Sequence, residues 1–221
     1  IATTHTQARY VLPEPVALLM RRFPKVKVAL HQGNPEQVAQ MLIEERADIG
    51  LATESLAGFD ELVTLPCYTW QHMMVVPAAH ALAAVERPTL EQLAAVPLVS
   101  YHPSFTGRTR IDAAFARAQL KPDIVLEAID SDVIKTYVRS GLGVGIVAEM
   151  ATRDDPVGGD LVSRSVGHLF GDNVSRVAFK RGAYLRSFVY TFAELLSERL
   201  TRALIVKAMA GSSEAGTDPA L

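Results

Sequence analysis

Residues 33–52 read GNPEQVAQMLIEERADIGLA, and this stretch indicates the fold class. Asn34 stands before a proline and three residues ahead of a glutamine, which is the pattern of a capped helix start. The apolar residues that follow at helical spacing predict the buried face of this helix: Val38, Met41 and Leu42. Residues 47–52 read as a short buried strand, and residues 25–31 alternate like a strand. A strand, a helix and a strand in this order are typical of a parallel sheet in an α/β protein.

Similar strand–helix repeats continue along the chain. Further strands are predicted at residues 1–3, 62–68, 72–77, 97–101, 124–129, 144–148 and 175–180. A short turn is predicted at residues 7–12. Helices are predicted at residues 13–22, after Thr89, from about Thr106, from about Asp130 and, as one long helix, at residues 185–204. Residues 154–173 are rich in glycine, aspartate and proline, and we expect loops there.

These repeats fall into two groups, which predicts two Rossmann-like lobes with the chain crossing between them twice. The crossings are expected near residues 75–77 and 174–176. Lobe I would then hold residues 1–75 and 175–205, and lobe II residues 76–174. Residues 206–221, which are mostly small and polar from Gly211 onward, are expected to form a disordered tail.

The helix after Asp130 leads into a glycine-rich segment. Val133, Tyr137 and Val138 are expected to face inward, and Lys135 and Arg139 to form a solvated face. The segment Gly141-Leu142-Gly143-Val144-Gly145 resembles a dinucleotide-binding loop, but it follows a helix and precedes a strand, the reverse of the required order. We interpret it as a helix end and a tight turn.

Composition excludes several classes of function. The 221 residues are 49% hydrophobic and carry a net charge of −2, which argues against nucleic-acid binding by this chain alone. One cysteine, Cys67, permits neither an internal disulfide nor a multi-cysteine zinc site, so a reducing, cytoplasmic setting is expected. No apolar run reaches the roughly 18 residues of a membrane span. The start at Ile1 suggests that the sequence begins within a longer protein.

Hydroxyl-bearing residues recur where helices begin or strands end. Thr4, Thr6 and Gln7 open the first helix, Thr53 ends a strand, and Thr106 begins another helix. In one interpretation a threonine simply caps its helix. In the other, the hydroxyls and backbone N–H groups hold a small anion without a counter-ion. The recurrence favours the second interpretation.

Other candidate sites are weaker. Cys67 could be a nucleophile with His72 as its base, but a lone cysteine in an apolar strand is more often a core residue. The six histidines show no spacing typical of a metal site, and we expect neither a metal nor another cofactor. Trp70, the only tryptophan, could pack in the core or close over a ligand.

Four segments resemble the CysB group of LysR-type transcriptional regulators. They are Thr-Thr-His-Thr-Gln-Ala-Arg-Tyr at 3–10, Leu-Pro-Cys-Tyr at 65–68, Phe-Thr-Gly-Arg at 105–108 and Asp-Val-Ile-Lys-Thr-Tyr-Val-Arg at 132–139. The resemblance implies a two-lobed fold like that of type II periplasmic binding proteins, with an effector in a central cleft. It implies a regulator of sulfur assimilation and cysteine biosynthesis rather than an enzyme. Residues 101–104, Tyr-His-Pro-Ser, depart from the family pattern, which has a glycine there.

The resemblance also implies the ligand and the partners. Sulfate-like anions, O-acetylserine or N-acetylserine would bind at Thr4, Thr6, Gln7, Thr53, Trp70 and Thr106. The chain would self-associate as a dimer, and as a tetramer in the full-length protein. Promoter DNA would be bound by an N-terminal winged helix-turn-helix domain that this sequence lacks. Two alternatives remain open: a periplasmic anion-binding protein of a transporter, and a small hydrolase that uses Cys67.

Overall fold

A computed structural model describes residues 1–153, 155 and 158–211, and it divides the chain into two compact α/β units. Unit 1 holds Ile1–Tyr68 and the chain from Val174 onward, and unit 2 holds Thr69–Asn173. The predicted α/β class with two crossings is therefore confirmed. The first crossing lies between Tyr68 and Thr69, earlier than the expected 75–77, because the strand from His72 pairs with strands of unit 2. The expected tail at 206–221 is wrong for residues 206–209, which belong to the helix Arg202–Met209, and residues 212–221 lie outside the described residues.

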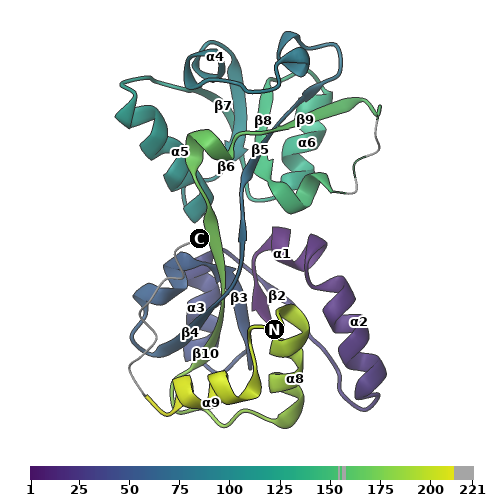
Figure 1. Cartoon of the computed structure of the whole chain (residues 1–221), viewed down its shortest axis with the longest axis vertical. Coiled ribbons are helices and arrows are strands. Elements are labelled where there is room, and N and C mark those ends of the chain that lie inside the picture. The colour runs from purple at the N-terminus through teal and green to yellow at the C-terminus, as the bar shows by residue number, and fades with distance from the viewer. Residues whose placement is uncertain (154, 156–157, 212–221) are drawn as a thin grey trace. The chain divides into compact units, whose positions relative to one another are not determined.

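Unit 1 is built on a five-stranded mixed sheet with the order β2-β1-β3-β10-β4 (Figure 1). Its elements are β1 (Ala2–Thr3), α1 (His5–Tyr10), α2 (Pro13–Arg22), β2 (His31–Gln32), α3 (Pro35–Ile43), β3 (Gly50–Thr53), the 3-10 helix η1 (Glu54–Gly58), β4 (Leu62–Trp70), β10 (Asn173–Lys180), α8 (Ser187–Leu196) and α9 (Arg202–Met209). Strands β2, β1 and β3 run parallel, and β10 is antiparallel to β3.

Alternation along the central strands of unit 1 fills a core on each face of its sheet. Leu51 and Val177 pack into the cluster beneath α2, α8 and α9, whereas the next residues along each strand, Ala52 and Ala178, pack beneath α3 and η1. Successive side chains of a strand point to opposite faces, so a continuous apolar run indicates a strand covered on both sides. The predicted helix start is also confirmed, since Asn34 forms a complete capping box with Gln37.

Unit 2 has a second five-stranded mixed sheet with the order β7-β6-β8-β5-β9. Its elements are β5 (His72–Pro77), the 3-10 helix η2 (Ala81–Ala84), α4 (Leu90–Ala94), β6 (Pro97–Tyr101), α5 (Thr106–Arg117), β7 (Asp123–Ala128), α6 (Ser131–Arg139), β8 (Val144–Ala148), the 3-10 helix η3 (Glu149–Thr152), β9 (Leu161–Ser165) and α7 (Gly167–Phe170). Strands β6, β7 and β8 are parallel, while β5 is antiparallel to β8 and β9.

The glycine-rich segment after α6 ends the helix, as predicted. Gly141 has a φ of +78°, and its N–H donates to the carbonyl of Val138 while the N–H of Leu142 donates to that of Tyr137. This pair of bonds is a Schellman motif. Gly145 lies under α6, where an added Cβ would be 2.8 Å from Val138 Cγ2. These glycines therefore serve the turn and the close packing of α6.

Three predicted segments differ from the structure. The strand expected at 25–31 is only His31–Gln32, and the loop expected at 154–173 contains β9 and α7. The expected long helix at 185–204 is split into α8 and α9. It breaks because Thr201 accepts a hydrogen bond from the N–H of Leu204 and starts a new helix.

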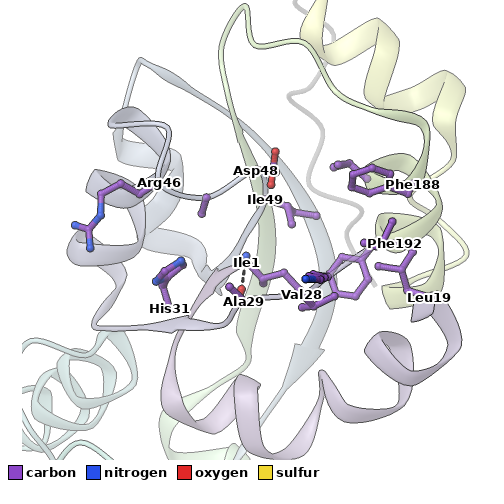
Figure 2. A pocket seen from close by; sticks show the side chains of 14 residues that line it. Ile1, Leu19, Val28, Ala29, His31, Arg46, Asp48, Ile49, Phe188 and Phe192 are labelled. Carbon is purple, nitrogen blue, oxygen red and sulfur yellow. Dashed lines mark hydrogen bonds between the residues drawn. The ribbon is translucent and has the colours of Figure 1, made fainter. Parts of the chain in front are cut away.

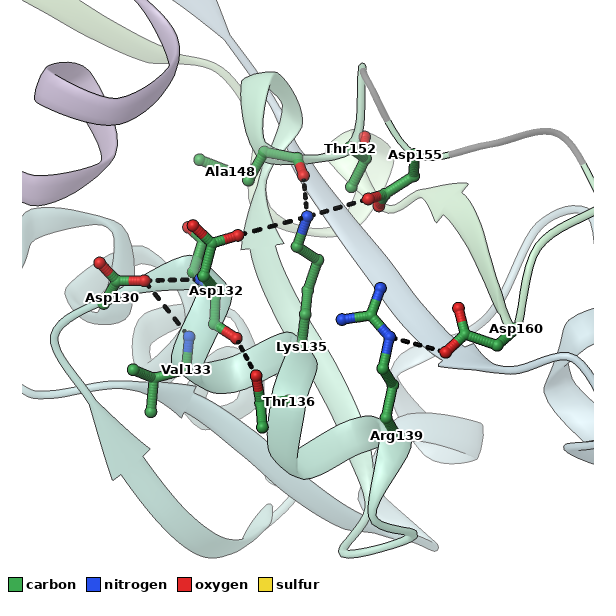
Figure 3. A network of polar contacts seen from close by, with 12 residues as sticks. Asp130, Asp132, Val133, Lys135, Thr136, Arg139, Ala148, Thr152, Asp155 and Asp160 are labelled. Atoms are coloured by element: carbon green, nitrogen blue, oxygen red, sulfur yellow. Dashed lines mark hydrogen bonds and ion pairs between the residues drawn. The ribbon is translucent and has the colours of Figure 1, made fainter.

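The expected solvated face of α6 is wrong for Lys135. Its side chain is only 7% exposed, and its Nζ donates to the carbonyl of Ala151 at 2.6 Å and to Asp155 at 3.0 Å (Figure 3). Val133 and Tyr137, expected to face inward, are each 42% exposed instead. The buried face of α6 is turned toward β8, β5 and β6, so Ile134, Lys135 and Val138 lie inside.

Candidate functional site

Thr4 and Thr53 lie at the carboxyl ends of two paired strands in unit 1. Strand β1 pairs in parallel with β3, with Thr3 opposite Leu51, so the chain leaves both strands at the same edge of the sheet. Thr4 is the N-cap residue before α1 and Thr53 is the N-cap residue before η1, and both are buried. Ligands of open α/β sheets bind beyond this edge.

The hydroxyls of Thr4 and Thr53 do not cap their helices. Among the described helix starts, five others whose side chains can accept from a backbone N–H do so: Asn34, His80, Thr89, Asp130 and Thr201. Thr4 and Thr53 have the same extended backbone, yet neither makes a side-chain capping bond. The capping interpretation therefore does not account for these two threonines.

Gln7 is tied into a buried polar network in unit 1. Its Nε2 donates to Ser175 Oγ at 2.9 Å, and its Oε1 accepts a hydrogen bond from the hydroxyl of Tyr68. Ser175 is the β10 residue opposite Thr53, so this network joins the start of α1 to the end of β3. Thr6 is half-buried in the same helix. The Gln7 side chain thus holds the first turn of α1 in place.

Trp70 and Thr106 lie close together in unit 2. Thr106 is the first residue of α5, and a Cβ added to the next residue, Gly107, would be 3.5 Å from Cη2 of the Trp70 indole. Trp70 is 6% exposed, and its Nε1 has no hydrogen-bond partner among the described residues. A buried indole N–H without an acceptor is costly, which marks it for a ligand or a water molecule.

Arg108 anchors the first turn of α5. Its guanidinium pairs with Asp112 and Glu127, each at 2.7 Å, and donates to the carbonyl of Tyr101 at 2.9 Å. Two carboxylates balance its single charge. Any attraction for an anion at Thr106 would therefore come from hydroxyls and backbone N–H groups rather than from this arginine.

Sequence reasoning missed the structural importance of His72. Its side chain is fully buried, and its Nδ1 lies 3.3 Å from Nδ2 of Asn173. Burial first, and the charge of Arg110 second, lower the pKa of His72 to about 3, so the imidazole is neutral. The available signal was the position of His72 in an apolar strand two residues after the only tryptophan.

A separate hollow lies at the opposite edge of the unit 1 sheet (Figure 2). It has a volume of about 150 Å³, and its walls include Ile1 and Ile49, which precede β1 and β3, together with Phe188 and Phe192 of α8. None of the predicted binding residues lines it. This hollow is therefore distinct from the group formed by Thr4 and Thr53.

Cys67 is a core residue of unit 1. Burial raises the pKa of its thiol to about 12, which keeps it protonated and unreactive. Among the described residues, no group of three or more His, Cys, Asp or Glu side chains could hold a metal ion. In the same residues, every helix is too short or too polar to cross a bilayer.

Comparisons with known proteins identify the family. Residues 1–201 match the LysR substrate binding domain. The chain is 55% identical to the HTH-type transcriptional regulator CysB of Burkholderia cenocepacia over 97% of its own length and 68% of that protein. It is 47% identical to the regulator SsuR of the same organism, over 93% of the chain and 66% of that protein. The chain thus spans about two thirds of these regulators.

A solved structure agrees with the sequence relatives. The cofactor-binding domain of the Cbl transcriptional regulator superposes with a TM-score of 0.88 at 44% identity, covering 94% of this chain and 91% of that one. These relatives are transcriptional regulators and not enzymes, and they give no support to the transporter alternative. The chain belongs to the LysR substrate-binding-domain family, as the effector-binding domain of a regulator related to CysB, SsuR and Cbl.

Proposed function

We propose that this chain senses a small anion or an acetylated serine on behalf of a regulator of sulfur assimilation and cysteine biosynthesis. Sulfate, O-acetylserine and N-acetylserine are the candidate effectors. In unit 1 the proposed binding residues are Thr4, Thr6, Gln7 and Thr53, and in unit 2 they are Trp70 and Thr106. A DNA-binding segment elsewhere in the full-length protein would carry the response to promoter DNA.

The observation that carries this proposal is the start of α1 at Thr4, where the threonine side chain makes no capping bond. Thr4 and Thr53 adopt the capping conformation without making the capping bond, and they lie at the ligand-binding edge of the sheet. Hydroxyls and backbone N–H groups at such an edge stabilise an anion through fixed dipoles. The names of the relatives, CysB and SsuR, are consistent with a sulfur-related effector.

The chemistry of the site predicts which ligands it prefers. Its donors are neutral, and none of the six proposed residues has a side chain that titrates near neutral pH. An effector with several acceptor oxygens, such as sulfate or a carboxylate with an acetyl group, could use several of these donors at once. Binding would shift the population of two arrangements of the domain in proportion to its differential affinity.

We also propose a surface for self-association, which LysR-type regulators use. Four apolar residues of unit 2 are 42–48% exposed on or next to β7 and α6, and we call them the α6–β7 patch: Val125, Ile129, Val133 and Tyr137. Strand β7 is also an edge strand of its sheet. Edge strands and exposed apolar side chains together favour pairing with another chain.

Calorimetric titration tests the effector assignment. We expect saturable one-site binding of at least one of sulfate, O-acetylserine and N-acetylserine. Sodium chloride is the control for sulfate, because chloride is an anion without the sulfate oxygens. Unmodified serine is the control for the two acetylserines, because it has the same amino-acid framework without the acetyl group. Absence of binding by all three candidates at millimolar concentration would overturn the assignment.

A further inference from the structure

The imidazole of His72 lies at a junction within unit 2. Its ring contacts the Trp70 ring edge-on at a centroid distance of 5.1 Å and the Phe170 ring at 5.6 Å. Its Nδ1 lies 3.3 Å from Asn173 Nδ2, a distance at which the amide can donate to the ring. Its Nε2 is buried and has no hydrogen-bond partner among the described residues.

The first turn of α5 rests directly on this ring. A Cβ added to Gly107 would lie 2.9 Å from His72 Nε2, closer than real Cβ atoms come to a neighbouring atom. The glycine therefore permits a close approach that any other residue would prevent. Because Gly107 follows Thr106, the imidazole sets the position of the turn that carries this hydroxyl.

The same ring contacts a residue beside each crossing of the chain. Trp70 is the second residue of unit 2 after the crossing at Tyr68, and Asn173 is the last residue of unit 2 before the crossing at Val174. We call residues 69–71 and 172–174 the crossing segments. Three parts of unit 2, distant in sequence, thus meet at one fully buried side chain.

We propose that His72 is a positioning residue that couples the first turn of α5 to both crossing segments. Occupation of the Thr106 site would then change the order of the segments that link unit 2 to unit 1. The nature of the ligand rests on the proposed function, whereas the coupling itself does not. Because the ring is neutral, the coupling works through packing and hydrogen bonding rather than through a change of charge.

A ligand-free mutant cycle tests the coupling. Gly107→Ala pushes a methyl group against His72, and overpacking of this kind is expected to speed amide exchange in both crossing segments by about fivefold or more. In a His72→Ala background the methyl group has room, and the same change is expected to speed exchange less than about twofold. His72→Asn serves as the background if His72→Ala does not fold.

The matched control is Gly58→Ala, because a Cβ there meets nothing within 4 Å. It should leave exchange in the crossing segments unchanged. Equal acceleration by Gly107→Ala in both His72 backgrounds, or no acceleration in the wild-type background, would overturn the proposal. Equal acceleration would show that the first turn of α5 affects the crossing segments without His72, and no acceleration would show that the two respond independently.

A second arm uses sulfate, with calorimetry run in parallel. In the wild type, sulfate should slow exchange at residues 105–108 and in both crossing segments. In His72→Phe, which keeps a ring but cannot accept from Asn173, the slowing should remain at 105–108 and fail to reach residues 172–174. Equal slowing at 172–174 in both proteins would contradict the coupling. If no candidate effector binds, the proposed function fails, and the glycine cycle still decides the coupling.

Discussion

Because the Thr4 hydroxyl does not cap α1, we expect it to contribute to ligand affinity but not to the stability of the fold. Thr4→Val keeps the shape of the side chain and removes its hydroxyl. Because this hydroxyl makes no capping bond, the free energy of unfolding should change by less than about 0.5 kcal/mol. A hydrogen bond to a charged group contributes about 1.5–3 kcal/mol, so affinity for sulfate should fall by about tenfold to 150-fold.

Thr89→Val provides the opposite case. Thr89 is the N-cap residue of α4. Its hydroxyl accepts a hydrogen bond from the N–H of Gln92 at 3.3 Å as part of a full capping box. Losing this cap should cost about 1 kcal/mol and lower Tm by about 2–4 °C, with affinity unchanged.

Calorimetric titration and thermal unfolding of both variants make the comparison. We expect a loss of affinity in Thr4→Val alone and a loss of stability in Thr89→Val alone. A Thr4→Val protein that is destabilised like Thr89→Val and binds sulfate as the wild type does would refute this expectation. Thr4 would then be a structural residue and not a binding residue.

Three further predictions concern other parts of the molecule. Lys135→Met leaves buried acceptors unpaired and should lower the free energy of unfolding, measured by urea titration, by about 1.5–3 kcal/mol. Arg139→Met, on the exposed part of the same helix, should lower it by less than about 1 kcal/mol. Tyr137→Lys in the α6–β7 patch should lower the mass of the assembly measured by sedimentation. Tyr184→Lys, at a residue that is 90% exposed outside that patch, should leave the mass unchanged. A Tyr137→Lys protein with the same mass as the wild type would show that the patch is not used for self-association. The pKa of His72 is lowered from 6.5 to about 3 in the folded chain, so between these pH values the imidazole is protonated only in the unfolded chain. The free energy of unfolding should therefore fall by about 1.4 kcal/mol for each unit by which the pH falls through this window. A pH series of unfolding titrations on His72→Phe should lack this contribution.

Local signals in the sequence predicted much of the fold. The capping boxes at Asn34 and Thr89 and the helix end at Gly141 depend on a few neighbouring residues, so their chemistry is visible along the chain. The strand at Pro97–Tyr101 was also predicted with its exact bounds, because an apolar run covered on both faces leaves few alternatives. The two-unit division follows from counting such repeats.

Features that depend on contacts between distant segments could not be predicted from the sequence. Lys135 is buried because Ala151 and Asp155, sixteen and twenty residues away, surround its amino group. No pattern within α6 reveals this. The proposed role of His72 likewise depends on Asn173 and Gly107, which only the folded chain brings close to it.

The threonines of the candidate site fall between these cases. Their positions at helix starts could be predicted, and the resemblance to the CysB group assigned them to a ligand. The sequence could not tell whether Thr4 caps its helix, because a threonine at that position has both options. Only the coordinates show that the capping bond is not made.

NMR titration of the isotope-labelled chain shows directly which residues the ligand contacts. On addition of sulfate, and separately of each acetylserine, we expect the largest amide shifts at residues 4–7, 53–55 and 105–108. Shifts at the hollow beside Ile1 and Phe188, with those three segments unchanged, would contradict this expectation. In that event the effector would bind at the other edge of the unit 1 sheet.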